Sequence, residues 1–267
     1  MRLIILILLC FSSHTFSQES IETSELKASL ISNCDKIPRN GSFSTGVLFD
    51  LKPDWHLYWI NPGDAGLAPK IQWRTSENIS TGDIQWAFPH AMELDGISNL
   101  GYSNQLLLPV TMQAQHINQN NIEVIAETSW LVCKDICIPG KTELKKTISV
   151  GESCNQNSHQ VLFANWQQKI PKTTELLNGT ASIVDKKFQL ELYFTQPLFR
   201  NATSVDVFIE NAQVVSYQAT HTQRWKHNWL SWTQDLNDVY TKMPAIIYAV
   251  IVIDHQQSYR IKISTDN

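Results

Sequence analysis

Hydrophobic residues recur along most of the chain at the two-residue spacing of half-buried β-strands. The runs are short and are separated by proline, glycine and asparagine, which favour turns. This pattern predicts a first group of strands at residues 26–31, 42–51, 55–60, 84–88, 105–112, 122–132 and 142–150. Residues 61–69 (NPGDAGLAP) hold two prolines and two glycines and predict a loop.

One segment has helical spacing instead. Val161, Leu162, Trp166 and Ile170 lie on neighbouring turns before Pro171, which predicts a helix over residues 158–170. Beyond it the pattern predicts strands at residues 181–184, 188–194, 205–209, 214–218, 225–232, 246–254 and 259–263, the first two forming a hairpin around 185–187. The expected protein is all-β.

The arrangement of these elements predicts two domains. Residues 18–151 are expected to form an immunoglobulin-like antiparallel β-sandwich, because many short strands occur with few helical patterns between them. Residues 152–174 form a connector with a short helix, and residues 175–267 form a second, smaller β-sandwich-like domain.

Composition excludes several classes of protein. The net charge is −4, from 21 Lys and Arg against 25 Asp and Glu, so the chain lacks the excess of basic residues expected of an electrostatic nucleic-acid binder. With 43% hydrophobic residues it does not have the composition of a disordered chain. No apolar run reaches the roughly 20 residues that a membrane-spanning helix needs.

The first 17 residues have the layout of a secretory signal peptide. Arg2 precedes an apolar stretch at residues 3–11, and small polar residues follow up to a possible cleavage site before Gln18. Leu9 disfavours the alternative of a lipid-modified Cys10. Cleavage would leave four cysteines, Cys34, Cys133, Cys137 and Cys154. An even number of cysteines in an exported protein predicts up to two disulfides.

Cys133 and Cys137 are separated by three residues. A disulfide between them requires the chain to turn, because four extended steps span about 13 Å, whereas bonded cysteines have Cα atoms roughly 4.4–6.8 Å apart. Lys134 and Asp135 form a polar turn between apolar flanks. Three interpretations stay open from these residues alone: a structural disulfide, a redox-active pair, and a metal site, which would need ligands not found nearby in sequence.

Cys34 and Cys154 flank the first predicted domain. Cys34 follows the first predicted strand and Cys154 follows the last one. The first and last strands of an immunoglobulin-like sandwich can run parallel, which brings these ends to one pole. We therefore expect a structural disulfide that closes the domain.

Four segments, in order, resemble the N-terminal periplasmic region of DsbD-type thiol:disulfide interchange proteins, most closely the copper-sensitivity-suppressor (ScsB) branch. They are residues 55–66 (WHLYWINPGDAG), residues 84–89 (IQWAFP), Gly101-Tyr102 before 107–110 (LLPV), and residues 130–144 (WLVCKDICIPGKTEL). The resemblance continues into the second predicted domain at residues 162–171, 207–209 and 246–254.

The resemblance implies a thiol–disulfide oxidoreductase of the protein-disulfide reductase type, without a cofactor or metal. Cys137 would attack a partner's disulfide and Cys133 would resolve the mixed disulfide, while Tyr102, within residues 94–102, would belong to a loop that caps the pair. It further implies that the protein is located in the periplasm of a Gram-negative bacterium. Its expected partners are thioredoxin-fold or disulfide-isomerase proteins, and it is not expected to bind nucleic acid.

The same resemblance sets the expected context. Members of the family continue into a membrane domain and a thioredoxin-like domain, whereas this sequence ends at Asn267, so we expect a separately encoded membrane electron donor. The associated processes are cytochrome c biogenesis and copper tolerance. The alternatives are a non-catalytic periplasmic binding or scaffold protein with a structural disulfide, and a copper-handling protein.

Overall fold

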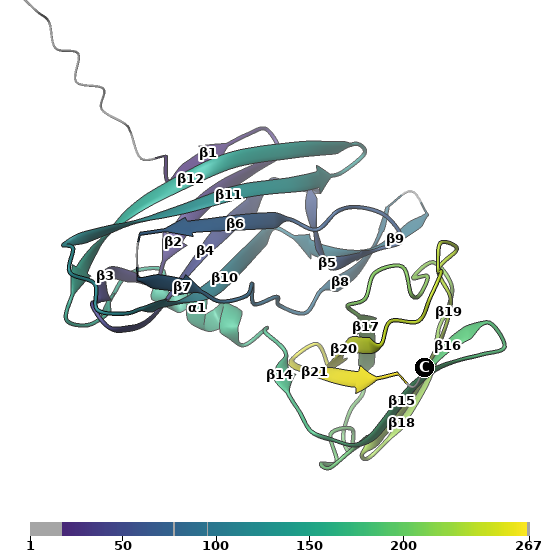
Figure 1. Cartoon of the computed structure of the whole chain (residues 1–267). Helices are drawn as coiled ribbons and strands as arrows, with labels where there is room; N and C mark the ends of the chain where they lie inside the picture. The colour runs from purple at the N-terminus through teal and green to yellow at the C-terminus, as the bar shows by residue number, and fades with distance from the viewer. Residues whose placement is uncertain (1–17, 77, 95, 266–267) are drawn as a thin grey trace, which may run out of the picture.

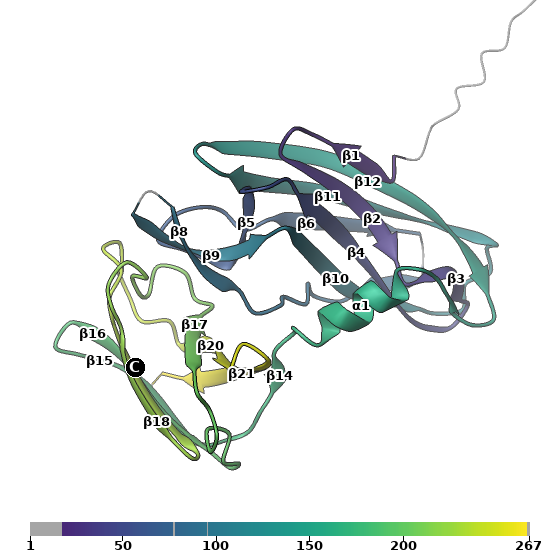
Figure 2. The same cartoon turned by 180° about the vertical axis from the view of Figure 1, so that it is seen from behind.

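The computed structural model describes residues 18–265 apart from residues 77 and 95. This part of the chain is built from four β-sheets and one short helix, so the predicted all-β class is confirmed. Figures 1 and 2 show two lobes, one built from β1 to β13 and the other from β14 to β21. The predicted signal peptide, with Cys10, lies outside the described residues.

The first lobe contains two facing sheets. One has the order β1 (Ser20–Glu22), β2 (Leu26–Ser32), β4 (Gly41–Leu51), β10 (Gln105–Ala114) and β7 (Ile79–Thr81). The other has the order β13 (Asn155–Gln156), β3 (Cys34–Pro38), β12 (Cys137–Gly151), β11 (Asn121–Cys133), β5 (His56–Gly63), β9 (Ile97–Ser103) and β8 (His90–Leu94), with β6 (Lys70–Thr75) also paired to β11. Neighbouring strands of this lobe are antiparallel except β3 and β12.

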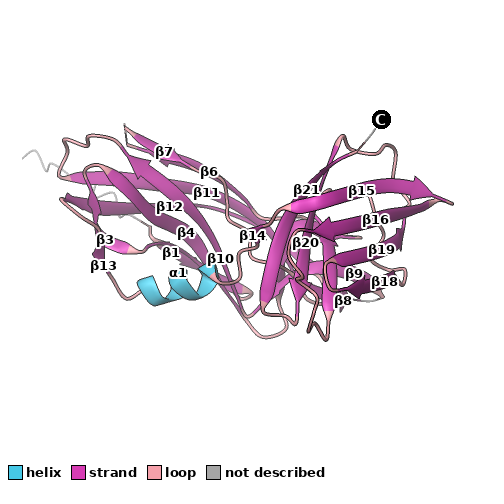
Figure 3. Cartoon of the chain, turned by 90° about the horizontal axis from the view of Figure 1, so that it is seen from below, coloured by secondary structure: helices cyan, strands magenta, loops and turns pink. Residues whose placement is uncertain are grey.

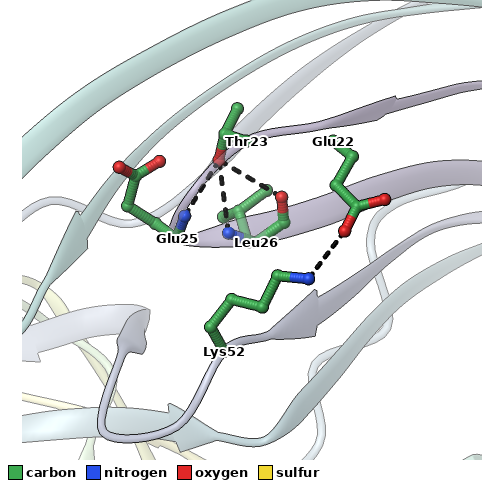
Figure 4. Close-up of polar contacts among 5 residues, drawn as sticks. All are labelled: Glu22, Thr23, Glu25, Leu26 and Lys52. Atoms are coloured by element: carbon green, nitrogen blue, oxygen red, sulfur yellow. Dashed lines mark hydrogen bonds and ion pairs between the residues drawn. The ribbon is translucent and has the colours of Figure 1, made fainter.

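Alternation along the strands places apolar side chains between these sheets. In β2, for example, Leu26, Ala28 and Leu30 are at most 1% exposed. At the edge, Thr23 Oγ1 accepts hydrogen bonds from the backbone N–H groups of Glu25 and Leu26, and Glu22 pairs with Lys52 (Figure 4). These contacts fix the turn from β1 into β2 and join β1 to the end of β4.

Helix α1 (Gln160–Gln167) connects the lobes and is shorter than the predicted 158–170. Its buried residues, Phe163 and Trp166, pack into the first core, so the helix lies along the first lobe (Figure 3). The second lobe then has two four-stranded sheets. They are β14 (Lys172–Thr173), β21 (Gln257–Ser264), β20 (Ile246–Ile253) and β17 (Val205–Ile209), and β15 (Leu176–Val184), β16 (Lys187–Phe194), β19 (Trp229–Asp235) and β18 (Thr222–Lys226).

Two predicted strands are wrong, because their backbone groups bond to scattered partners instead of one neighbouring strand. In the segment predicted as strand 84–88, Gln85 N–H bonds to Pro109 O and Phe88 N–H to Lys169 O. Residues 214–218 form only an isolated bridge, between Val215 and Leu236.

Other predicted boundaries change. The predicted strand 225–232 is two strands, because the chain turns at His227, whose φ is +51°. Strand β5 runs on to Gly63, into the segment predicted as a loop. The sequence pattern did not predict β6 or β8, which are short and poorly buried.

The two lobes share a packed interface. Phe208 and Val250 of the second lobe belong to the core of the first, and the ring of Phe208 meets Trp59 edge-on at 6.2 Å between centroids. Asn61 Nδ2 donates a hydrogen bond of 2.7 Å to Ile209 O across this interface. Within residues 18–265, apart from 77 and 95, no helix has the length and apolar character needed to cross a membrane.

Candidate functional site

Cys133 and Cys137 lie at the tip of the long β11–β12 hairpin. They are the last paired residues of the two strands, their Cα atoms are 4.1 Å apart, and a disulfide joins them. The turn between them is closed by a hydrogen bond from Lys134 N–H to Ile136 O. The polar turn predicted from Lys134 and Asp135 is therefore the hairpin turn itself.

The two cysteines differ sharply in exposure. Cys133 is completely buried, whereas Cys137 is exposed and follows Ile136, which is 65% exposed at the tip of the turn. Thiol–disulfide exchange requires that one sulfur approach another in line with the bond that breaks, so access decides which sulfur reacts. This geometry presents Cys137 to an incoming protein and keeps Cys133 behind it.

Tyr58 is the aromatic residue that reaches the sulfurs. Its hydroxyl oxygen lies 3.0 Å from Cys133 Sγ and 3.9 Å from Cys137 Sγ. The register explains this contact: Cys133 pairs with His56, and side chains two residues apart on β5 share one face of the sheet. The rings of His56 and Tyr58 meet edge-on at 5.3 Å between centroids.

Burial sets the protonation of both rings. It raises the pKa of Tyr58 above the usual value for a phenol, and it lowers the pKa of His56 below the usual value for an imidazole. At neutral pH the phenol is a hydrogen-bond donor and the imidazole is uncharged. The pair thus offers the buried sulfur a neutral O–H donor.

Two glycines lie beside Tyr58, one on the neighbouring strand and one against its ring. Gly101 pairs with Tyr58 across β5 and β9, and a Cβ there would overlap the carbonyl oxygen of Leu57. Gly66 has φ of +107° and lies against the ring, so that a Cβ at this position would overlap it. The loop of the NPGDAG motif therefore covers Tyr58 from the side.

An ion pair borders the hairpin turn. Lys134 Nζ lies 2.9 Å from Asp54 Oδ2, and this hydrogen bond together with the charge of Asp54 raises the pKa of Lys134. The negative charge of Asp54 partly balances the positive charge of Lys134. Lys134 therefore has less effect on the pKa of a nearby cysteine thiol. The ion pair is exposed and is screened by solvent and salt.

Tyr102, predicted to lie in a capping loop, is placed in the sandwich interior. It is buried, its hydroxyl donates a hydrogen bond of 2.7 Å to Ala87 O, and its ring lies near Trp166. Of the predicted loop 94–102, Leu94 ends β8 and residues 97–102 lie in β9. Gly96 O accepts a hydrogen bond from Gln218 Nε2 of the second lobe.

Sequence reasoning missed Tyr58. The residue lies inside the 55–66 motif, and strand alternation places it on the same face as His56. Only the register between β5 and β11 puts that face beside Cys133.

A second disulfide joins Cys34 to Cys154, with Cα atoms 5.4 Å apart. Cys34 begins β3, which runs parallel to β12, and Cys154 lies between β12 and β13, both of which pair with β3. At this end of the sandwich, β3 meets the last two strands of the lobe, β12 and β13. Among the described residues, no group of three or more His, Cys, Asp and Glu side chains is placed to hold a metal ion.

Residues 31–149, which span β3 to β12 and both redox candidates, match the family described as thiol:disulfide interchange protein DsbD, N-terminal. This segment is similar to the DsbD N-terminal family. The resemblance inferred from the four sequence motifs is confirmed, and the segment is of the thiol–disulfide interchange type.

Among solved structures, the chain is similar to the N-terminal periplasmic domain of ScsB from Proteus mirabilis. The TM-score is 0.68 at 17% identity, over 93% of this chain and 97% of that chain, so the shared fold includes both lobes. A conserved domain protein from Bacillus anthracis overlaps with a TM-score of 0.26 at 11% identity, over 93% of this chain and 89% of that chain. That overlap is too loose to inform on fold or function. No curated protein matches the sequence.

Proposed function

We propose that this chain is a periplasmic thiol–disulfide exchange module that reduces a disulfide in a partner protein through Cys137 and Cys133. The observation that carries the proposal is the unequal exposure of two bonded cysteines at a hairpin tip: Cys137 is exposed and Cys133 is completely buried. The redox domain of the proposal is residues 18–151, residues 152–174 are the connector, and residues 175–267 are the second domain.

The reaction starts from the reduced pair. The thiolate of Cys137 attacks one sulfur of the partner's disulfide, a mixed disulfide forms, and the other partner sulfur leaves as a thiolate that takes up a proton. The thiolate of Cys133 then attacks Cys137 Sγ, the mixed disulfide breaks, and the first partner sulfur leaves. Two electrons and two protons reach the partner, and Cys133 and Cys137 are left as a disulfide.

Tyr58 assists the second step. A buried thiol has a raised pKa in apolar surroundings, which disfavours the thiolate that Cys133 must become. The Tyr58 hydroxyl, 3.0 Å from Cys133 Sγ, donates a hydrogen bond to that sulfur, and such a bond strengthens when the acceptor is charged. Tyr58 therefore offsets the effect of burial at the moment when Cys133 attacks.

The partners follow from the chemistry. DsbD-type domains act with thioredoxin-fold proteins, so the proposed acceptor is a periplasmic thioredoxin-fold or disulfide-isomerase protein. Each turnover leaves an oxidised pair that needs two electrons. The proposed donor is a membrane protein with a dithiol of its own.

Trapping of mixed disulfides tests the roles of the two cysteines. A Cys133→Ala variant keeps the exposed Cys137 and lacks the resolving thiol, so it should accumulate a covalent complex with an oxidised thioredoxin-fold protein. Cys137→Ala should accumulate far less, and Cys34→Ala/Cys154→Ala is the control for general loss of a disulfide. Equal trapping by both single variants would contradict the assigned order.

The reduction potential separates exchange from the alternative of a structural disulfide. A Cys133–Cys137 potential in the glutaredoxin range, about −200 to −230 mV, supports exchange. A potential below about −300 mV marks a structural bond and would leave a non-catalytic binding protein as the better description.

A further inference from the structure

The second lobe holds the loop that covers Tyr58, and Asp64 is the centre of that contact. Asp64 Oδ1 accepts hydrogen bonds from Tyr217 N–H at 3.0 Å and from Asn237 Nδ2 at 3.3 Å, and Oδ2 lies 3.5 Å from Ser216 Oγ. All three donors belong to the second lobe, whereas Asp64 follows β5 of the first. One carboxylate thus fixes two segments of the second lobe, residues 216–217 and residue 237, on the NPGDAG loop.

The loop is held at its start as well. Asn61 Nδ2 donates to Ile209 O of the second lobe, while Asn61 Oδ1 accepts from Gly63 N–H at 3.1 Å. Asp64 N–H donates to Ser98 O at the beginning of β9. The second lobe therefore contacts the loop at two points three residues apart, and the backbone between them is tied to the sheet that carries the cysteines.

From Asp64 a short path leads to the sulfurs. Two residues further on, Gly66 lies against the ring of Tyr58, and the hydroxyl of Tyr58 contacts Cys133 Sγ. A Cβ added at Gly66 would overlap the ring, so the loop backbone lies directly beside it. A shift of the loop would change the packing of Gly66 on the Tyr58 ring. The ring position in turn sets the distance between the Tyr58 hydroxyl and Cys133 Sγ.

We propose that Asp64 is a positioning residue through which the second lobe sets the reduction potential of the Cys133–Cys137 pair. The proposal rests on the proposed function, since the potential matters only for a pair that cycles. The hydrogen bond from Tyr58 stabilises the reduced form, because it strengthens toward a thiolate. If Asp64 releases the loop and the ring relaxes, that bond weakens and the equilibrium with glutathione shifts toward the disulfide.

A double-mutant cycle on the whole mature chain tests this. The variants are Asp64→Ala, Tyr58→Phe and the two combined, and the quantity measured is the equilibrium constant of the Cys133–Cys137 pair with glutathione. We expect each single variant to shift the constant toward the disulfide by at least about threefold. If Asp64 acts through the hydroxyl of Tyr58, the double variant should match Tyr58→Phe alone.

Three controls make the result specific. Asp64→Asn keeps the acceptor for Tyr217 N–H and should behave like the unaltered protein. Asn237→Ala removes one of the donors to Asp64 without changing any residue of the loop, and should give a smaller shift in the same direction. This measurement stands even if Asp64→Ala fails to fold. Gln218→Ala removes another hydrogen bond between the lobes, to Gly96 O away from Tyr58, and should leave the constant unchanged.

An unchanged constant in both Asp64→Ala and Asn237→Ala would overturn the proposal, and so would a double variant whose shift is the sum of the single shifts. Failure of the proposed function gives a different result. In that case Cys133→Ala traps no partner, although the glutathione constant still responds to Asp64.

Discussion

The hydroxyl of Tyr58 lies 3.0 Å from Cys133 Sγ, on the buried side of a disulfide whose other sulfur is carried by an exposed residue. The contact places a proton donor at the sulfur that must act second, whereas Cys137 Sγ lies 3.9 Å from the same oxygen. The two sulfurs therefore differ in environment as well as in access.

Tyr58→Phe should slow the resolution of the mixed disulfide. A hydrogen bond to a charged group contributes about 1.5–3 kcal/mol, so loss of the hydroxyl should reduce the rate of partner release by about tenfold or more. Rapid-quench analysis of the mixed disulfide measures this step. Formation of the mixed disulfide by Cys137 should change much less, and an equal slowing of both steps would contradict the assignment.

Gly66→Ala should destabilise the protein by about 2–4 kcal/mol, because a Cβ at φ of +107° is strained and would also overlap the Tyr58 ring. Gly96→Ala is the matched control. Its φ is also positive, at +76°, but an added Cβ there meets open space, so the expected loss is about 1 kcal/mol. Urea unfolding followed by tryptophan fluorescence measures both. Equal losses would mean that Gly66 does not pack on the ring.

Removal of the second disulfide should affect stability and spare the redox pair. The Cys34–Cys154 bond closes a loop across 120 residues, for which chain entropy gives about 4–5 kcal/mol. Cys34→Ala/Cys154→Ala should lower the free energy of unfolding by about that amount. The glutathione constant of Cys133–Cys137 should stay the same, and a large change in it would show that the two disulfides are coupled.

His56 should make the protein less stable in acid. Burial lowers its pKa in the folded state, so the unfolded state binds more protons between that lowered value and about 6.5. The free energy of unfolding should fall as the pH drops below about 6.5. In His56→Gln the fall should be smaller, although His90, whose pKa is also lowered, keeps part of it. An unchanged pH dependence would show that His56 does not titrate with unfolding.

The pattern of apolar residues predicted the strands that bury one face along their whole length. Alternation located β2, β4, β10, β11 and β20 closely, because one face of each strand is buried against the same core along its length. The prediction failed at 84–88, 214–218 and 225–232. In the first two, apolar residues are buried without a neighbouring strand. In the third, a turn at His227 separates two apolar runs that look continuous in sequence.

Cysteine spacing and the polar Lys134-Asp135 step sufficed to predict a turn at residues 133–137, because four residues cannot be bridged in an extended chain. The sequence by itself thus determined the all-β class, the positions of the cysteines and the family of residues 31–149. Only the tertiary structure decided that Tyr58 rather than Tyr102 faces the sulfurs, and that Asp64 joins the two lobes. Both depend on pairing between segments far apart in the chain, β5 with β11 and the NPGDAG loop with residues 216–237, and no local pattern encodes that register.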